Sequence, residues 1–313
     1  MSALNAPHFQ NADEARKHLE GLLWGGEPVC PHCGSVDRAY KTKKVGVYRC
    51  AEPECRKDFT VTTGTVMERS RVPLHLWMQA FYLMASSKKG YSAHQLHRTL
   101  GVTYKTAWFM AHRIREAMRA GGLSVPPMGG PGKIVEADET YFGKVDKMNR
   151  RTTRTSGEPF IKKGKRGGPA NKRPIISLVE RGGNVRSFHV AVANKVNVTD
   201  IVRSNVDRET RLHTDESRLY QGSGEHFASH ETVKHAAGEY ARGDVNTNSV
   251  EGYFSIFKRG MRGVYQHCAE KHLHRYLAEF DFRYNARKIS DGERAALALV
   301  GISGKRLTYR ISD

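Results

Sequence analysis

The apolar positions between residues 246 and 260 recur with the period of a helix. An apolar side chain stands at i, i+3, i+4 and i+7, which predicts a buried face made of Val250, Tyr253, Phe254 and Phe257. Glu251 and Lys258 lie two helical turns apart on a neighbouring face. Asn248 and Glu251 also have the spacing of a capping box, in which the acid would only close the start of the helix. The pattern alone leaves both interpretations of Glu251 open.

A second helical stretch extends from residue 73 to residue 118. Its first part, "PLHLWMQAFYLMASS", is densely apolar and predicts a core helix. Ser92 and Thr103 then occupy expected N-cap positions, with Gly101 in the short turn between two helices. This order predicts a helix-turn-helix-like DNA-binding domain over residues 67–122, although a three-helix bundle with a charged face has the same pattern. The side chains expected to face DNA are Lys105, His112, Arg113 and Arg115.

After a Gly- and Pro-rich linker at 123–132, the pattern changes to short strands. A strand with Asp138 in its middle comes first, and "PIISLVE" and "NVRSFHVAV" follow as a hairpin. A helix capped by Asn197, a short strand ending at Asp215 and a new helix complete the series. The alternation predicts a mixed-sheet α/β domain over residues 133–290, with acids gathered at one end of the sheet, followed by a C-terminal tail at 291–313.

Three acids of this domain are candidate metal ligands: Asp138, Asp215 and Glu251. A carboxylate in a core strand is costly unless it is paired or bound to a cation. Oxygen ligands suit Mg²⁺ or Mn²⁺, and two such ions at one site can drive in-line phosphoryl transfer. We expect Glu139 and Glu216 to lie outside the ligand set, because they flank the candidate ligands on opposite faces. Glu136 shares strand parity with Asp138, and its role stays open.

Four of the five cysteines form two close pairs, which predict a zinc ribbon over residues 21–66. The pairs are Cys30-x2-Cys33 and Cys50-x4-Cys55, with 16 residues between them. Thiolates in tight turns at this spacing suit one tetrahedral Zn²⁺. Residues 39–48 alternate like a hairpin with its turn near 44–46, and "DFTVTTGT" predicts a further strand. Residues 1–20 are expected to be a lead-in to the ribbon.

The chain of 313 residues carries a formal net charge of +19, with a sequence pI near 9.8. Such a charge favours a polyanionic partner, and we expect double-stranded DNA. Eleven Lys or Arg and two acids fall within a Gly-containing basic loop at 144–173. The DNA contacts expected outside the helical domain are Lys162, Lys163, Lys165, Arg166, Lys258 and Arg259. An apolar run of about 18 residues and a signal peptide are both absent from the sequence, so we expect a cytoplasmic, nucleoid-associated protein.

From Leu19 to Lys288 the chain resembles the DDE-type insertion-sequence transposases that carry an N-terminal zinc ribbon, the ISXO-like group. The resemblance rests on "CPHCGS", "TGTVMERSRVPLHLWMQAFYLM", "LGVTYKTAWFMAHRIREAM", "EADETYFGK", "HTDESRLY" and "NTNSVEGYFSIFKRGMRGVYQH". It implies an RNase H-like catalytic fold and Mg²⁺-dependent cleavage and strand transfer of DNA. The resemblance also implies that Asp138, Asp215 and Glu251 are the catalytic acids and that Lys258 is a basic residue of the site. Asn248 is the alternative third member of the triad.

The expected function is that of a transposase that cleaves the ends of an insertion sequence and joins the 3′-hydroxyl ends to target DNA. The expected cofactors are two Mg²⁺ or Mn²⁺ ions at the active site and one structural Zn²⁺. At least a dimer of the chain is expected on the DNA. Two other functions fit parts of the sequence: a zinc-ribbon and helix-turn-helix regulator without catalysis, and an RNase H-like nuclease that only hydrolyses.

Overall fold

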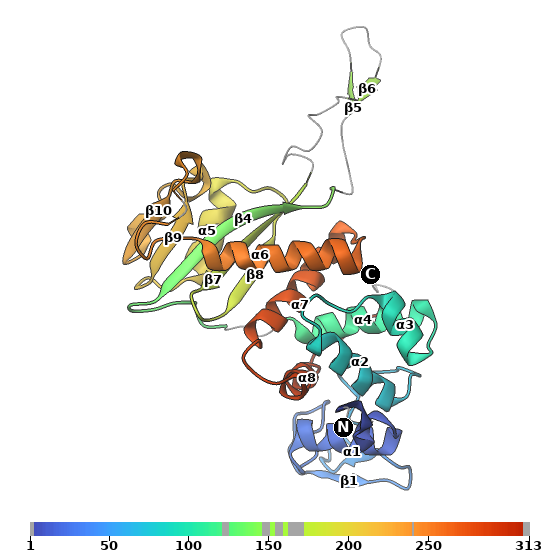
Figure 1. Ribbon diagram of the computed structural model, residues 1–313. Helices are drawn as coiled ribbons and strands as arrows, with labels where there is room; N and C mark the ends of the chain where they lie inside the picture. Colours follow the sequence, from blue (N-terminus) through green and yellow to red (C-terminus); the bar gives the residue numbers. More distant parts are fainter. Residues whose placement is uncertain are drawn as a thin grey trace. The chain divides into compact units, whose positions relative to one another are not determined.

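The computed structural model describes residues 3–120, 125–145, 172–239 and 241–308, together with the backbone of 151–153 and 159–161. The chain divides into two compact units (Figure 1). The first unit combines Met1–Ala120 with Ala286–Asp313, and the second is Gly121–Asn285.

The first unit begins with a helix and a small sheet. Short 3-10 turns at Ala3–Asn5 and Pro7–Phe9 precede helix α1, Ala12–Trp24. Strands β1 (Ala39–Lys41), β2 (Tyr48–Cys50) and β3 (Asp58–Phe59) then form an antiparallel sheet. The predicted hairpin is confirmed, with its turn closed by Gly46 in a left-handed conformation. The predicted third strand is shorter than expected, since only two of its residues pair with β2.

Helices complete the first unit. They are α2 (Leu74–Ser86), α3 (Ala93–Leu100), α4 (Tyr104–Met118) and α8 (Asp291–Val300). The predicted N-caps are confirmed, because Ser92 and Thr103 accept hydrogen bonds from the backbone of the helices they precede. Gly101 ends α3 in a left-handed conformation, as the predicted turn requires.

The expectation of a tail at 291–313 is wrong for its first ten residues. Helix α8 packs on α2 and buries Ala295, Ala298 and Leu299. Ser290 and Glu293 form a capping box at its start. The three-residue spacing from Ser290 to Glu293 is typical of a capping box, and it indicates that a helix begins here rather than a tail.

The second unit is built on a five-stranded mixed sheet. Its spatial order is β10-β9-β4-β7-β8. The strands are β4 (Ile134–Phe142), β7 (Arg173–Glu180), β8 (Val185–His189), β9 (Arg211–Asp215) and β10 (Ser229–Val233). Strand β7 pairs antiparallel with β4 and β8, which confirms the predicted hairpin, and β4, β9 and β10 run parallel. Strands β5 (Arg151–Thr153) and β6 (Pro159–Ile161) pair separately.

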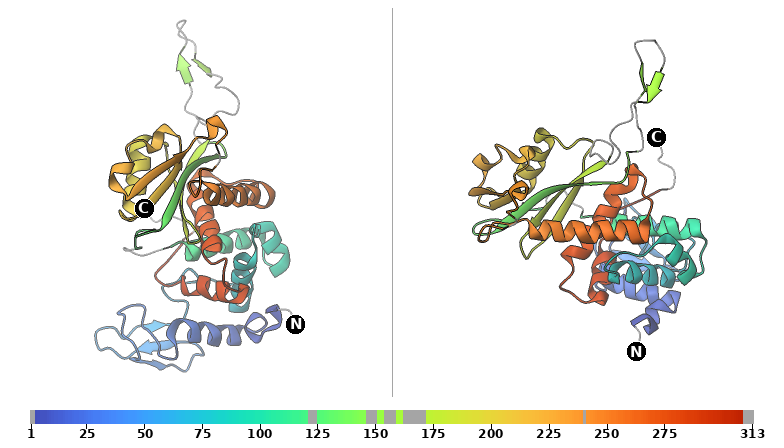
Figure 2. Two further views of the ribbon diagram at one scale, coloured as in Figure 1. Left: turned by 60° about the vertical axis from the view of Figure 1, so that its left-hand side comes forward. Right: turned by 45° about the horizontal axis from the view of Figure 1, so that its top comes forward.

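Helices cover both faces of this sheet (Figure 2). Helix α5, Lys195–Asn205, packs on one face, and α6, Asn248–Gly260, and α7, Leu273–Asn285, pack on the other. The middle of β7 is largely apolar because it contributes to both clusters: Ile175 and Val179 enter one, and Ile176 and Leu178 enter the other. Short helical turns lie at Arg218–Tyr220, Gly224–His226, His235–Ala237, Met261–Tyr265 and Glu270–His272.

Two local expectations in this unit need correction, and a third is confirmed. Helix α5 is capped by Asn194 rather than Asn197, because the Asn194 side chain accepts from the Asn197 amide. The helix expected after Asp215 is only a short 3-10 turn. The helix predicted near residue 246 is present, and its expected buried face is confirmed. Among the described helices, none combines the length and the hydropathy needed to cross a bilayer.

Two leucines of α8 test its packing. Leu299 is 3% exposed and Leu297 is 50% exposed. Leu299→Ala should lower the free energy of unfolding by about 2–5 kcal/mol, because it leaves a cavity. Leu297→Ala, the same change on the same helix, should alter it by less than about 0.5 kcal/mol. Urea denaturation measures both, and equal small effects would show that α8 is not part of the core.

Candidate metal centres and active site

Strands β4 and β9 bring acidic side chains together where their pairing ends. The ladder between the two strands stops at the pair Glu136 and His213. If it continued in the same register, Asp138 would lie opposite Asp215. Oxygen atoms of Asp138, Glu139 and Asp215 lie within 4.8 Å of one another. The two aspartates predicted from the sequence therefore meet in the structure, and Glu139 joins them.

Burial and mutual repulsion make this cluster electrostatically costly. Burial, with the nearby charges of Glu139 and Asp215, raises the pKa of Asp138 to about 8. Burial also raises the pKa of Asp215, and burial followed by the charge of Asp215 raises that of Glu139. Hard oxygen donors at this spacing fit a divalent cation, which would offset the repulsion. The residues present therefore fit the metal ions expected from the sequence.

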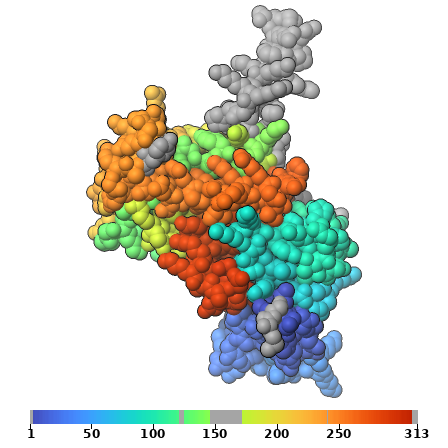
Figure 3. Space-filling model, viewed as in Figure 1, coloured from blue at the N-terminus to red at the C-terminus, as the bar shows by residue number. Residues whose placement is uncertain are grey.

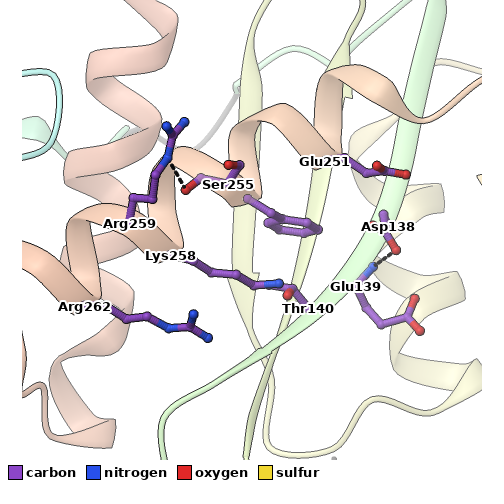
Figure 4. A pocket seen from close by; sticks show the side chains of 9 residues that line it. Asp138, Glu139, Thr140, Glu251, Ser255, Lys258, Arg259 and Arg262 are labelled. Carbon is purple, nitrogen blue, oxygen red and sulfur yellow. Dashed lines mark hydrogen bonds between the residues drawn. The ribbon is translucent and has the colours of Figure 1, made fainter.

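Helix α6 supplies the facing wall of the site (Figure 4). A hollow of about 460 Å³ is lined by Asp138, Glu139, Thr140, Glu251, Phe254, Ser255, Lys258, Arg259 and Arg262. Glu251 and Lys258 extend from α6 toward β4. Burial lowers the pKa of Lys258, and the charge of Asp138 acts in the opposite direction. The polar side of α6 thus faces the acids, while its apolar side enters the core.

The carboxylate of Glu251 has neighbours of its own. The Thr247 hydroxyl donates to Glu251 Oε1 at 3.0 Å, and His235 Nε2 lies 3.6 Å from the same oxygen. Glu216 accepts hydrogen bonds from the amides of His235 and Ala236, both at 2.8 Å. Glu216 therefore holds the turn that carries His235, which places that ring beside Glu251.

The capping box, one of the two interpretations that the sequence left open for Glu251, is absent from the start of α6. Asn248 is the first residue of the helix rather than its cap, and its side chain is not among those that line the hollow. Thr247 takes the flanking position, without a side-chain bond to the backbone of the first turn. Glu251 is therefore not engaged as a cap, and its carboxylate remains on the side of the hollow.

Glu139 is the acid that sequence reasoning missed. Strand alternation places it on the face opposite to Asp138, and for that reason it was expected outside the ligand set. Its carboxylate lies near Asp215 nonetheless, and the Ser217 hydroxyl donates to it at 3.4 Å. The one sequence signal for the role of Glu139 is its place beside Asp138 in "EADE". Strand alternation could not reveal that role, because a two-residue period carries no information about where paired strands separate.

The four clustered cysteines form a second candidate metal centre. Their sulfur atoms lie within 4.8 Å of one another, with Cys30 and Cys55 at 3.8 Å and Cys33 and Cys50 at 3.6 Å. Four sulfurs at Zn–S distances of about 2.3 Å would stand about 3.8 Å apart at the corners of a tetrahedron. A disulfide would need about 2.05 Å. The cluster therefore fits one Zn²⁺.

Local structure explains why the thiols converge. Gly34, in a left-handed conformation, donates its amide to the Cys30 carbonyl and closes the first knuckle. Hydrogen bonds from Ser35 lower the pKa of Cys33 to about 6, whereas burial raises the pKa of Cys30. Trp24 of α1 packs edge-on against Tyr48 and Phe59 beneath the cluster.

The residues expected to contact DNA divide into three groups. On α4, Lys105 is exposed and lines a hollow of about 310 Å³ with Arg69, Arg71 and the half-buried Arg113. His112 and Arg115 of the same helix are only 1% and 2% exposed, so the expectation that they face DNA is wrong. Both residues lie on the buried side of α4, so their side chains point into the unit rather than toward solvent.

The other two groups lie on α6 and in the basic loop. Lys258 and Arg259 line the hollow beside the acids. The orange segment that contains α6 forms part of the face seen in Figure 3. Lys162, Lys163, Lys165 and Arg166 fall outside the described residues.

Two family models match the chain. The ISXO2-like transposase domain matches residues 129–285, and the transposase zinc-ribbon domain matches residues 10–58. An uncharacterised protein in transposable element ISH50 of Halobacterium salinarum is 30% identical over 286 residues, which cover 88% of this chain and 91% of that protein. The crystal structure of the Mos1 mariner paired end complex with Mn has 15% sequence identity, covers 65% of this chain and 75% of that chain, and gives a TM-score of 0.23. That TM-score is too low to inform this fold.

The cysteine geometry predicts one zinc per chain. Cys50→Ser should lower the bound zinc well below one equivalent and loosen the sheet around it, because metal binding and folding are coupled in small metal domains. Cys268→Ser is the matched control, since Cys268 is not part of the described cluster. Elemental analysis of the purified variants gives the stoichiometry, and four free thiols in a metal-free wild-type chain would contradict the assignment.

The raised pKa of Asp138 predicts a pH-dependent affinity for Mg²⁺. Bound ions require the charged carboxylate, so affinity should increase from about pH 6 to about pH 8, with proton release. Because this acid has a higher pKa in the folded than in the unfolded chain, metal-free stability should fall over the interval from about pH 4 to about pH 8. Asp138→Asn should remove that contribution.

Calorimetry in buffers of different ionisation enthalpy measures the protons released when Mg²⁺ binds. An affinity that stays constant across this pH range, with no proton release, would show that Asp138 is already charged in the metal-free chain.

Proposed function

The chain belongs to the ISXO2-like transposase family, and we propose that it cleaves the ends of an insertion sequence and joins the freed 3′-hydroxyl ends to target DNA. The observation that carries this proposal is the meeting of Asp138, Glu139 and Asp215 beside the α6 wall that bears Glu251 and Lys258. Acids so close together serve little purpose in a protein that only binds DNA, because they repel its phosphates.

The sheet supports the RNase H-like fold that the family resemblance implies. Three antiparallel strands, β8, β7 and β4, continue into the parallel strands β9 and β10. The central strand β4 carries Asp138, and its parallel neighbour β9 ends at Asp215. The acids consequently lie on neighbouring strands, just beyond the last residue pair of the β4–β9 ladder.

The clustered acids and the residues that line the hollow have separate proposed roles. Asp138, Asp215 and Glu251 are proposed to hold two divalent ions, Mg²⁺ or Mn²⁺, with Glu139 as a further candidate ligand. Such ions, when bound, activate the attacking oxygen and stabilise charge on the leaving oxygen. Lys258 would bind a phosphate next to the scissile bond, and the exposed Arg259 and Arg262 would continue that contact along the strand.

DNA binding beyond the hollow is proposed for the first unit and the basic loop. Lys105 and Arg113, with the neighbouring Arg69 and Arg71, present four cations around one concave surface. The family resemblance supports a helix-turn-helix role for α3 and α4, and the net charge of +19 supports contacts from Lys162, Lys163, Lys165 and Arg166. Because two element ends must be joined to one target, we propose that at least two copies of the chain act together.

Glu251→Gln tests the proposed chemistry. Gln keeps the length of the side chain but loses the negative charge, so the rates of cleavage and joining should both fall by more than about 100-fold. Loss of a residue that only supports a metal ligand usually costs about 10- to 100-fold, so a larger loss indicates direct ligation. The assay incubates the protein with Mg²⁺, a labelled DNA end from the segment flanking its coding sequence, and a target plasmid. DNA binding and thermal stability should stay near wild-type values.

Asn248→Ala is the control in the same helical turn. Its side chain is exposed, so stability should change by less than about 0.5 kcal/mol and activity by about twofold at most. An inactive Asn248→Ala beside an active Glu251→Gln would make Asn248 the third ligand. Cleavage without any joined product would favour a nuclease, and full activity of Glu251→Gln would remove this acid from the mechanism.

A further inference from the structure

Glu136 is a fully buried acid that the proposed chemistry does not use. It lies on β4, two residues before Asp138 and on the same face of the strand, and it is 0% exposed. An isolated charge at such a position would be costly, so its partners define its role.

The first partners of Glu136 are in the opening turn of α6. The amides of Ser249 and Val250 donate to Glu136 Oε2 at 2.7 and 3.1 Å, and the Ser249 hydroxyl donates to Oε1 at 2.9 Å. Amides at the start of a helix have no acceptor within the helix, and the helix dipole favours a negative charge there. The Glu136 side chain on the central strand β4 thus caps the N-terminus of α6, the helix that carries Glu251.

The second partner is Arg181, which directly follows β7. Its Nε and Nη2 atoms donate to Glu136 Oε1 at 2.9 and 2.8 Å. It also donates to the carbonyl of Asp244 at 2.8 Å and to that of Asn246 at 3.2 Å, in the segment that leads into α6. Arg181 therefore ties that segment to the same carboxylate.

These contacts leave Glu136 little capacity to bind a metal ion. Five donor groups point at its two oxygens: Arg181 Nε and Nη2, the Ser249 hydroxyl, and the amides of Ser249 and Val250. A carboxylate offers about four lone-pair sites. Its acceptor capacity is thus already filled by protein groups, unlike that of Asp138.

We propose that Glu136 and Arg181 are positioning residues that set the separation between Asp138 on β4 and Glu251 on α6. The inference rests on the proposed function, since it assigns to this pair the spacing of the proposed metal ligands. Strand β4 is paired on both sides, so an acid on it holds the helix start at a fixed place. Glu251 follows Val250 directly, and any shift of the first turn moves its carboxylate relative to Asp138.

Mn²⁺ binding to the full-length, zinc-loaded chain, followed by electron paramagnetic resonance without DNA, tests the inference. Glu136→Gln and Arg181→Gln should each weaken Mn²⁺ binding by about 10- to 100-fold, as loss of a group that orients a ligand does. Glu180→Gln is the matched control, because Glu180 accepts from Lys133 and the Gly129 amide in the same unit. Within the described part of the chain Glu180 makes no hydrogen bond to α6, so Glu180→Gln should bind Mn²⁺ within about twofold of wild type.

Arg181→Gln separates positioning from direct ligation. If Glu136 were itself a metal ligand, removing the competing cation would tighten Mn²⁺ binding, whereas loss of a positioning contact weakens it. Tighter binding, or affinities within twofold of wild type for both Glu136→Gln and Arg181→Gln, would overturn the inference. If Glu136→Gln does not fold, Arg181→Gln decides in the same way, and Ser249→Ala should weaken binding by about two- to tenfold.

Two further measurements distinguish failure of this inference from failure of the proposed function. Amide hydrogen exchange in the first turn of α6 should accelerate in metal-free Glu136→Gln and stay unchanged in Glu180→Gln; unchanged exchange in both would overturn the inference. Asp138→Asn should lose the Mn²⁺ site. If it binds Mn²⁺ like wild type, the proposed metal site is wrong; if it loses Mn²⁺ while the Glu136 and Arg181 variants keep it, only the positioning role is wrong.

Discussion

Repulsion between three partly buried carboxylates is the constraint on which the second unit depends. Oxygen atoms of Asp138, Glu139 and Asp215 lie within 4.8 Å of one another, and burial reduces the screening that water would provide. Relaxation of the backbone would separate these acids. Three features oppose that movement: pairing of β4 with β7 through the acids, pairing with β9 as far as Glu136, and apolar clusters on both faces of the sheet. The packed core therefore supplies the free energy that keeps the acids together.

Helix α6 has one face in the apolar core and another face at the proposed active site. Its buried face, which includes Val250 and Phe257, belongs to the cluster beneath the sheet, while Glu251 and Lys258 line the hollow. The same helix therefore anchors the unit and presents charged groups to the acids of β4. The carboxylate of Glu136 fixes its first turn by accepting two backbone amides. Tight packing makes such a helix a precise support, because a buried face cannot slide without opening cavities.

Local patterns determined a large part of this molecule in advance. The four-cysteine spacing predicted the cysteine cluster that fits a Zn²⁺ ion, because the four thiols lie in short turns around one small sheet. The apolar period around residue 250 located α6 and its buried face, and the caps at Ser92 and Thr103 located α3 and α4. Each of these features depends on residues close together in the chain, whose spacing is itself the signal. Asp138 and Asp215 were also predicted as strand residues, but their meeting joins two separate strands of the fold.

Contacts between distant segments were decided only by the tertiary structure. Glu139 joined the acids because β4 and β9 stop pairing after Glu136, which strand alternation cannot foretell. His112 and Arg115 looked like a DNA-facing pair, yet both are buried in the fold. The role of Glu136 depends on Ser249, 113 positions away. A sequence records which faces are polar or apolar, but the partner of a buried charge is chosen by three-dimensional packing, since its free energy depends on which donors come within reach.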